Sequence, residues 1–286
     1  MHSDALSDSL QLLYEVFIYS GWHPLPHTSK HLYSVFKCAP SSVSAEYLLA
    51  RHVDGEGLVK PSGALMTRIL RYPICTQAVL EALFRLPYYS ITEKNISGTI
   101  ELPRRLFRTL SPRSARPWSA QDKPLPFLRY VYDHPRIPPP NPNCWDGYAL
   151  TRAVAAGFVP LVKFLLEQGA SPACKGSIAV HAAIRRKSLP LVKMLIEPDT
   201  TPVIHANSIG KGVGDSFHAG KGKRQRQEDV QLVKRSSKRR RLEDRVPVDQ
   251  QMLRTAVACD ARDIVKYFMD EKFCMPDMQT VRLMRN

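Results

Sequence analysis

The sequence has no long hydrophobic run. None of its apolar stretches approaches the ~18 residues that a membrane-spanning helix needs. Near the N-terminus, Asp4 and Asp8 stand before Leu10, where a secretory signal would carry basic residues. We therefore expect a soluble protein that neither enters a membrane nor is secreted.

Paired cysteines and the motifs of common catalytic sites are also missing. The six cysteines are widely scattered without a C-x-x-C pair, which fits reduced thiols better than disulfides or a zinc site. Neither G-x-G-x-x-G nor G-x-S-x-G occurs, and no pair of carboxylates is placed for acid–base chemistry. We expect a non-enzymatic protein without a cofactor or a bound metal.

The sequence does contain three copies of one apolar cassette. Each copy predicts a short helix of small and apolar residues, followed by a second helix richer in large aliphatics. An alanine and a lysine stand ten residues apart in every copy: Ala153 and Lys163, Ala183 and Lys193, Ala256 and Lys266. Such repetition is typical of repeat proteins, in which stacked helical hairpins form an extended surface in place of an enclosed cleft.

The first copy resembles an ankyrin repeat, whose pattern begins T-P-L-H-x-A and closes on a G-A turn. The matching residues are 148–153 (YALTRA), Gly157, 161–166 (LVKFLL) and 169–172 (GASP). With substitutions, the resemblance extends over residues 145–200 and 249–275. It implies a stack of helical hairpins that binds another protein.

Two glycine positions of this pattern change in the later copies. Lys187 and Asp199 take them in the second copy, and Asp260 takes one in the third. Because glycine accepts a positive φ without steric cost, the replacements predict either distorted turns or a degenerate branch of the family. His181 stands at the motif histidine, where the resemblance implies a hydrogen bond to the neighbouring repeat's backbone. A role as base or metal ligand is the alternative.

In the ankyrin family, the first helices and turn tips line a concave face. Basic residues take exposed positions of this kind at Arg152, Arg185, Arg186, Lys187 and Arg254. A basic concave face would favour an acidic protein partner. The alternative is a solvated polar face that binds nothing.

A basic insertion separates the second and third copies. Ala153 and Ala183 are 30 residues apart, whereas Ala183 and Ala256 are 73 apart. Residues 211–245 hold 12 Lys and Arg against 5 Asp and Glu, so they account for about half of the net charge of +15. Because this composition offers little apolar surface to offset chain entropy, we expect a disordered loop over 204–248.

Two basic clusters in this loop resemble a bipartite nuclear localisation signal. Their residues are Lys223, Arg224, Lys234, Arg235, Lys238, Arg239, Arg240 and Arg241. We expect them to bind an import receptor and direct the protein to the nucleus. One alternative is a solvated charge run. The other is non-specific nucleic-acid binding, which is less favoured because Phe217 is the one aromatic residue of the segment.

The N-terminal region, 1–40, carries a second resemblance. Residues 10–20 (LQLLYEVFIYS) predict an amphipathic helix, 24–26 (PLP) break it, and 28–36 (TSKHLYSVF) begin another. This pattern is similar to an F-box, the segment that docks on a Skp1-type adaptor. The adaptor contacts implied by the resemblance are Leu12, Leu13, Val16 and Phe17. The alternative is an N-terminal cap that closes the repeat stack.

Short apolar stretches predict further helices between these regions. They cover 45–51, 64–72, 77–85, 102–110 and 126–132. Because some echo the first cassette, residues 41–136 are expected to hold diverged helical repeats. Ankyrin-like repeats are expected over 137–203 and, after the loop, over 249–286. The expected fold class is therefore all-α, a helical-hairpin repeat solenoid with an N-terminal cap and a disordered basic insertion.

These features predict a non-enzymatic nuclear adaptor that binds another protein. One alternative is an F-box-type substrate receptor of a cullin ubiquitin ligase. The second is weak nucleic-acid binding through the basic loop.

Overall fold

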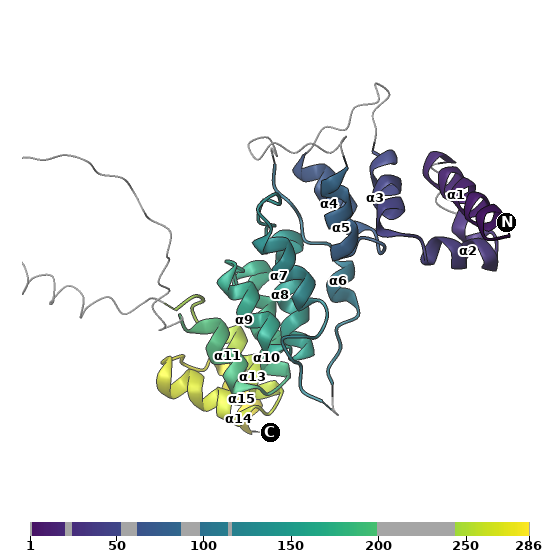
Figure 1. Ribbon diagram of the computed structural model, residues 1–286. Coiled ribbons are helices and arrows are strands. Elements are labelled where there is room, and N and C mark those ends of the chain that lie inside the picture. Colours follow the sequence, from purple (N-terminus) through teal and green to yellow (C-terminus); the bar gives the residue numbers. More distant parts are fainter. Residues whose placement is uncertain are drawn as a thin grey trace, which may run out of the picture. The chain divides into compact units, whose positions relative to one another are not determined.

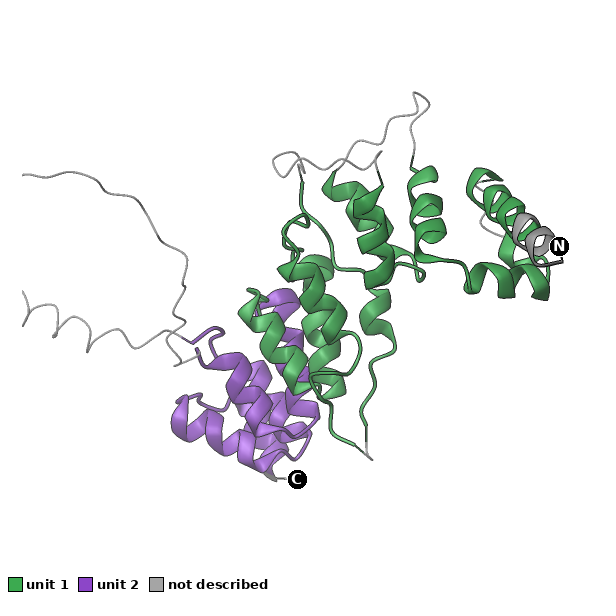
Figure 2. Ribbon diagram, in the orientation of Figure 1, with its two compact units in different colours: residues 1–171 green, residues 172–286 purple. Residues whose placement is uncertain are grey.

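The computed structural model describes residues 2–20, 25–52, 62–86, 98–113, 116–198 and 244–285. These residues form helices joined by turns and loops, so the predicted all-α class is confirmed for the described part of the chain. Within that part, the one β feature is an isolated bridge between Glu101 and Asn141. Backbone contacts divide the chain into two compact units, Met1–Ser171 and Pro172–Asn286 (Figures 1 and 2). The division lies inside the predicted 137–203 segment.

The first unit contains nine α-helices and one 3-10 helix among its described residues. They are α1 (His2–Ser20), η1 (Leu25–His27), α2 (Lys30–Lys37), α3 (Ser41–Ala50), α4 (Gly63–Arg71), α5 (Gln77–Arg85), α6 (Arg105–Arg108), α7 (Leu125–Asp133), α8 (Cys144–Ala156) and α9 (Val159–Glu167). Four of the five predicted helices agree with α3, α4, α5 and α7 to within a few residues. The fifth, predicted over 102–110, is a single turn. Side-chain caps start α4 and α5, because Ser62 accepts a hydrogen bond from the Leu65 amide and Thr76 accepts one from the Val79 amide.

The N-terminal helices share one hydrophobic core. Leu48, Met66, Ile69 and Leu80 from α3, α4 and α5 are fully buried in it. Phe17 joins this core from α1. Its ring stacks on Phe36 at 4.2 Å and on Tyr47 at 3.9 Å between centroids. These aromatic contacts attach α1 and α2 to α3.

Helices α6 to α9 form two hairpins, α6–α7 and α8–α9. They stack first helix on first helix and second helix on second helix. Helix α6 packs on α8. Helix α7 meets α9 where Tyr132 lies edge-on to Phe164, with ring centroids 5.4 Å apart. Trp118, in the loop between α6 and α7, stacks on Phe158 at 4.5 Å and donates a hydrogen bond to the Ala156 carbonyl. The long loop of the α6–α7 hairpin is therefore anchored on the α8–α9 turn.

The second unit repeats this arrangement. Its described helices are α10 (Cys174–Arg185), α11 (Leu189–Ile196), α13 (Gln250–Ala258), α14 (Arg262–Lys266), the π-helical turn η2 (Tyr267–Glu271) and α15 (Met278–Arg285). Helix α10 packs on α13, and α11 packs on α14, so the two hairpins stack first helix on first helix. Val180, Leu195, Leu253 and Phe268, one from each of α10, α11, α13 and η2, are fully buried in this unit.

The same left-handed turn closes the first helix of all three cassettes. Gly157, Lys187 and Asp260 have φ values of 71°, 52° and 50°. In each turn, this residue donates its amide hydrogen three residues back, and the next residue donates five residues back: Gly157 to Val154, Phe158 to Ala153, Lys187 to Ile184, Ser188 to Ala183, Asp260 to Val257 and Ala261 to Ala256. The predicted distortion is therefore wrong at Lys187 and Asp260, because the hydrogen bonds and packing hold non-glycine residues in a strained conformation. Asp199 lies outside the described residues.

A second left-handed turn lies within the first residues of α8 and α10. Three successive residues just after the start of each helix have positive φ: Trp145, Asp146 and Gly147 in α8, then Lys175, Gly176 and Ser177 in α10. The two turns are 30 residues apart, the same distance as between Ala153 and Ala183. The third cassette begins differently, because Asp249 caps α13 by accepting a hydrogen bond from the Met252 amide at 2.7 Å.

Candidate protein-interaction surfaces

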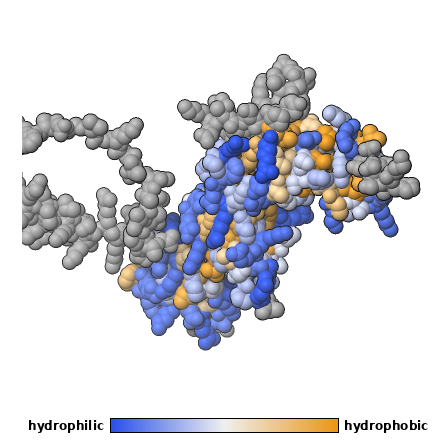
Figure 3. Space-filling view, in the orientation of Figure 1, coloured by the Kyte–Doolittle hydropathy of each residue, from blue (hydrophilic) through white to orange (hydrophobic). Residues whose placement is uncertain are grey.

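Helix α1 presents an exposed apolar face. Leu12, Val16 and Tyr19 have exposed fractions of 62%, 53% and 83%. Their spacing of four and three residues puts them on one side of the helix. Figure 3 shows hydrophobic residues gathered on the surface over α1 and α3.

A groove of about 430 Å³ also runs between α1 and α3. Its lining residues are Leu10, Gln11, Tyr14, Glu15, Ile18, Pro40, Val43 and Glu46. Glu15 and Glu46 are exposed at this otherwise largely apolar groove. Helix α1 thus leaves apolar surface uncovered on more than one side.

The structure separates the residues predicted to contact an adaptor. Leu12 and Val16 are exposed, and Leu13 is half-buried. Phe17 is only 5% exposed and belongs to the aromatic stack with Phe36 and Tyr47. As a correction, Phe17 is a core residue that supports α1 and does not offer its ring to a partner. Tyr19, which the sequence reasoning did not select, takes its place on the exposed face.

Two of the five basic residues predicted to bind a partner instead bond within the fold. The Arg152 guanidinium donates hydrogen bonds to the carbonyls of Phe107, Arg108 and Leu110, and so satisfies the C-terminal end of α6. Arg254 pairs with the Asp277 carboxylate, which also accepts hydrogen bonds from Thr280. Long-range bonds of this kind carry no sequence signal, because 42 or more residues separate Arg152 from its acceptors.

The remaining three predicted basic residues, Arg185, Arg186 and Lys187, form an exposed group at the end of α10. Lys187 borders a shallow pocket of about 280 Å³, lined otherwise by residues 260–264 of the next hairpin. Asp260 and Asp263 belong to that lining, so the local charge is mixed. This surface is exposed to solvent but is not uniformly basic.

His181 contacts the neighbouring hairpin. Its Nδ1 lies 3.1 Å from the Thr255 hydroxyl, which itself donates to the Gln251 carbonyl. The Thr255 oxygen therefore accepts from an Nδ1–H of the imidazole. Burial lowers the pKa of His181, with Asp249 opposing and Arg185 reinforcing that shift. A neutral imidazole that bridges α10 and α13 fits the expected inter-repeat role, with a side chain as acceptor in place of the backbone.

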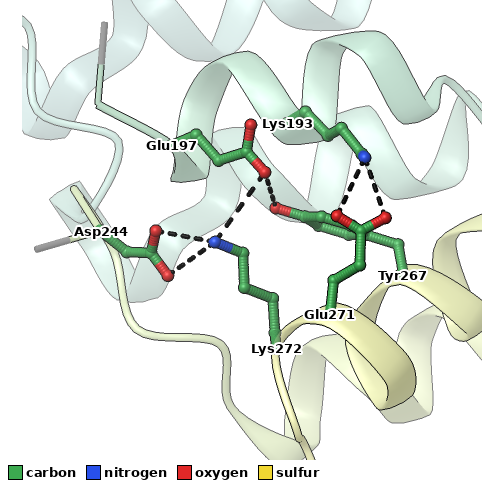
Figure 4. A network of polar contacts seen from close by, with 6 residues as sticks. All are labelled: Lys193, Glu197, Asp244, Tyr267, Glu271 and Lys272. Carbon is green, nitrogen blue, oxygen red and sulfur yellow. Dashed lines mark hydrogen bonds and ion pairs between the residues drawn. The ribbon is translucent and has the colours of Figure 1, made fainter. Parts of the chain in front are cut away.

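The predicted import signal lies outside the described residues, as does most of the predicted disordered loop, but the residues on either side of 199–243 are described. The Arg245 amide donates to the Ile196 carbonyl at 2.7 Å, and the Arg245 guanidinium donates to the Met194 carbonyl. The polar network in Figure 4 adds the Lys272 ammonium, 2.7 Å from Asp244 and 3.9 Å from Glu197. The described chain at Ile196 and the described chain at Arg245 therefore lie side by side.

Tyr267 and Glu271 complete this network. The Tyr267 hydroxyl donates to Glu197 at 2.9 Å, while Lys193 pairs with Glu271 at 3.0 Å (Figure 4). Burial and the bond to the Glu197 carboxylate raise the pKa of Tyr267, so this phenol stays protonated as a donor. The stem network, as we name it, consists of Lys193, Glu197, Asp244, Tyr267, Glu271 and Lys272.

One repeated element was missed by the sequence reasoning. Helix α7 begins with Leu125-Pro126-Phe127-Leu128-Arg129, which corresponds to Val159-Pro160-Leu161-Val162-Lys163 in α9 and Leu189-Pro190-Leu191-Val192-Lys193 in α11. Pro126, Pro160 and Pro190 each take one of the first two helical positions, where proline's missing amide hydrogen costs nothing. The proline spacing of 34 and 30 residues was the available signal.

Within the described part of the chain, no helix is long and apolar enough to cross a membrane. The same residues contain no converging group of three or more His, Cys, Asp and Glu side chains that could hold a metal ion. Comparisons of the chain with protein-family models, with curated proteins and with solved structures gave no match.

Proposed function

We propose that this chain is a non-enzymatic nuclear adaptor that holds another protein on a stack of ankyrin-like helical hairpins. The observation that carries the proposal is the repetition of one turn at Gly157, Lys187 and Asp260, with the same two hydrogen bonds each time. Repeated hairpins that stack in register create an extended surface, and the usual role of such a surface is to bind a macromolecule.

The stem network supports the nuclear part of this proposal. Because Arg245 and Asp244 return the chain to the Ile196 end of α11, a segment at 199–243 can carry basic clusters without separating the two hairpins. An import receptor binds such clusters in an extended form. An insertion whose two ends are held together on the folded unit can present them in this way.

Two measurements on the intact chain test this function. A fluorescently tagged chain should accumulate in the nucleus, and a variant with Lys238 to Arg241 changed to alanine should not. Affinity purification from nuclear extract should recover the same proteins with both. Cytoplasmic retention of the unmodified chain would contradict the nuclear assignment, and failure to recover any protein reproducibly would contradict the adaptor role.

An F-box-type substrate receptor is the second candidate function. It is favoured by the exposed Leu12, Val16 and Tyr19 side chains, which lie on a helix that Phe17 attaches to the core. An apolar helix face fixed to a folded domain suits a hydrophobic groove on an adaptor.

This candidate is tested by co-purification with a Skp1-type adaptor. The informative variant is Leu12→Asp with Val16→Asp, because both side chains are exposed and we expect their replacement to leave the fold intact. Val159→Asp, which alters an exposed aliphatic residue on α9, is the matched control. Loss of the adaptor with the α1 variant alone supports an F-box; absence of the adaptor from the unmodified chain excludes it.

A further inference from the structure

A cluster of arginines surrounds an exposed tryptophan where α4, α6 and α8 meet in the first unit. Arg104 lies over the Trp145 ring with its guanidinium carbon 4.4 Å from the centroid, and Arg71 lies 5.5 Å from the same centroid. Arg104 also lies 5.3 Å from the Tyr148 ring. Trp145 is 39% exposed and is oriented by the hydrogen bond that its indole donates to the Leu102 carbonyl. We name Arg68, Arg71, Arg104, Trp145 and Tyr148 the arginine–tryptophan surface.

Two shallow hollows adjoin at Arg71. One, of about 260 Å³, is lined by Arg71, Pro103, Arg104, Arg105 and Trp145. The other, of about 210 Å³, lies beside Arg68, Arg71 and Glu101. Both are smaller than the ~300 Å³ at which small-molecule pockets begin. They suit individual side chains of a partner that lies across the surface.

The charge of this region is strongly one-sided. Residues 62–72, 98–113 and 143–152 contain seven arginines, no lysine and only two acidic residues, Glu101 and Asp146. Glu101 already pairs with Arg71 at 2.9 Å. A partner therefore meets an excess of guanidinium groups, whose planar fork matches a carboxylate better than a lysine ammonium does.

Not every arginine here is available to a partner. Arg105 donates to the carbonyls of Leu70 and Cys75, and burial lowers its pKa. Arg152 is bound to the end of α6. These two side chains hold α4, α6 and α8 together and so fix the positions from which Arg71 and Arg104 extend.

From this geometry we infer that the arginine–tryptophan surface binds an acidic segment of a partner protein. The inference rests on the proposed adaptor function and locates its partner on the first unit. An acidic peptide is favoured over single-stranded nucleic acid because Arg104 occupies a face of Trp145 and also lies close to Tyr148. A base would have to displace it in order to stack. Carboxylates can bind the guanidinium edges while the rings stay in place.

The test uses the full chain with Lys238 to Arg241 changed to serine, so that the basic segment does not dominate binding. Fluorescence anisotropy measures its affinity for a labelled glutamate-rich peptide near physiological salt. We expect Arg71→Gln with Arg104→Gln to weaken binding by about 10- to 100-fold, the effect of losing charge-assisted hydrogen bonds. Arg85→Gln with Arg129→Gln removes two exposed arginines of α5 and α7 and should leave the affinity unchanged. Equal loss in both double variants would overturn the inference.

A photo-reactive group on the same peptide locates the contact. Crosslinks are expected within residues 62–72, 98–113 and 143–152. Crosslinks confined to other residues would overturn the site, even if proteins are still recovered from nuclear extract, in which case the adaptor function stands. Oligothymidylate of equal charge is the competitor. If it binds more tightly than the peptide and loses that affinity in the Arg71 and Arg104 variant, the surface recognises nucleic acid instead.

Discussion

Helices α1 and α11 carry similar apolar side chains in opposite environments. In α11, Leu191, Val192, Leu195 and Ile196 are at most 3% exposed, because α10 and α14 pack around them. In α1, one face packs through Phe17, while Leu12, Val16 and Tyr19 remain more than half exposed. The comparison separates apolar residues that stabilise the hairpins from apolar residues that stay exposed on the surface, as the proposed partner surface on α1 requires.

The largest difference in stability should appear when a leucine is truncated in each of the two helices. Leu195→Ala in α11 should lower the free energy of unfolding by about 2–5 kcal/mol, because it leaves a cavity in a dry core. Leu12→Ala should change it by less than ~0.5 kcal/mol, because water already surrounds the side chain. Chemical denaturation followed by circular dichroism measures both.

Within α1 itself, Phe17→Ala serves as the internal control and should cost about 3–5 kcal/mol. If Leu12→Ala destabilises the protein as much as Phe17→Ala does, then α1 is buried in solution, and its exposed face is not a partner surface.

A smaller effect is expected at the hairpin turns, a feature that α1 lacks. Lys187→Gly and Asp260→Gly should each stabilise the protein by about 1 kcal/mol, because glycine relieves the strain of a positive φ. Gly157→Lys should destabilise by a similar amount for the opposite reason. Thermal melts of the three variants give the comparison. A loss of stability in both glycine variants would show that the Lys187 and Asp260 side chains contribute more than their strain costs.

The third effect is a pH dependence of the hairpin contact between α10 and α13. Burial places the pKa of His181 below its unfolded value of about 6.5, so the unfolded chain binds the proton more readily. Stability from this residue is complete above about pH 6.5 and decreases as the pH falls below it. The His181→Gln variant should show a shallower loss of melting temperature between neutral and mildly acidic pH. His52 and His134, whose pKa values burial also lowers, contribute to the slope that remains. If melting temperature falls with pH equally in the unmodified chain and in the His181→Gln variant, His181 is not the source of this pH dependence.

The smallest effect on stability should follow from replacing residues 200–243 with a short Gly-Ser linker. The hydrogen bond from Arg245 to Ile196 and the stem network already hold the ends of this segment together, so the change in stability should be near zero. Lys272→Ala, which removes the ammonium that joins Asp244 to Glu197, should destabilise the linker form and the full chain alike. A large loss of stability on linker replacement alone would show that the replaced segment packs on the hairpins.

Sequence periodicity located the helices well and their side-chain partners poorly. The expected helix at 77–85 coincides with α5, and the expected 64–72 differs from α4 by one residue at each end. Apolar spacing and a Ser or Thr cap are local signals, which is why they suffice. Arg152 and Arg254 looked like surface cations, yet their acceptors come from α6 and from Asp277, which no local pattern indicates.

The all-α class, the cassette spacing and the place of the basic insertion could be read from the amino-acid sequence, because they depend on periodicity and composition. The separation of Phe17 in the core from Tyr19 on the surface came from packing, since both belong to one amphipathic helix until a neighbour covers one side. The arginine–tryptophan surface has the same origin. Arg71, Arg104 and Trp145 are far apart in the chain, and packing of α4, α6 and α8 brings their side chains together.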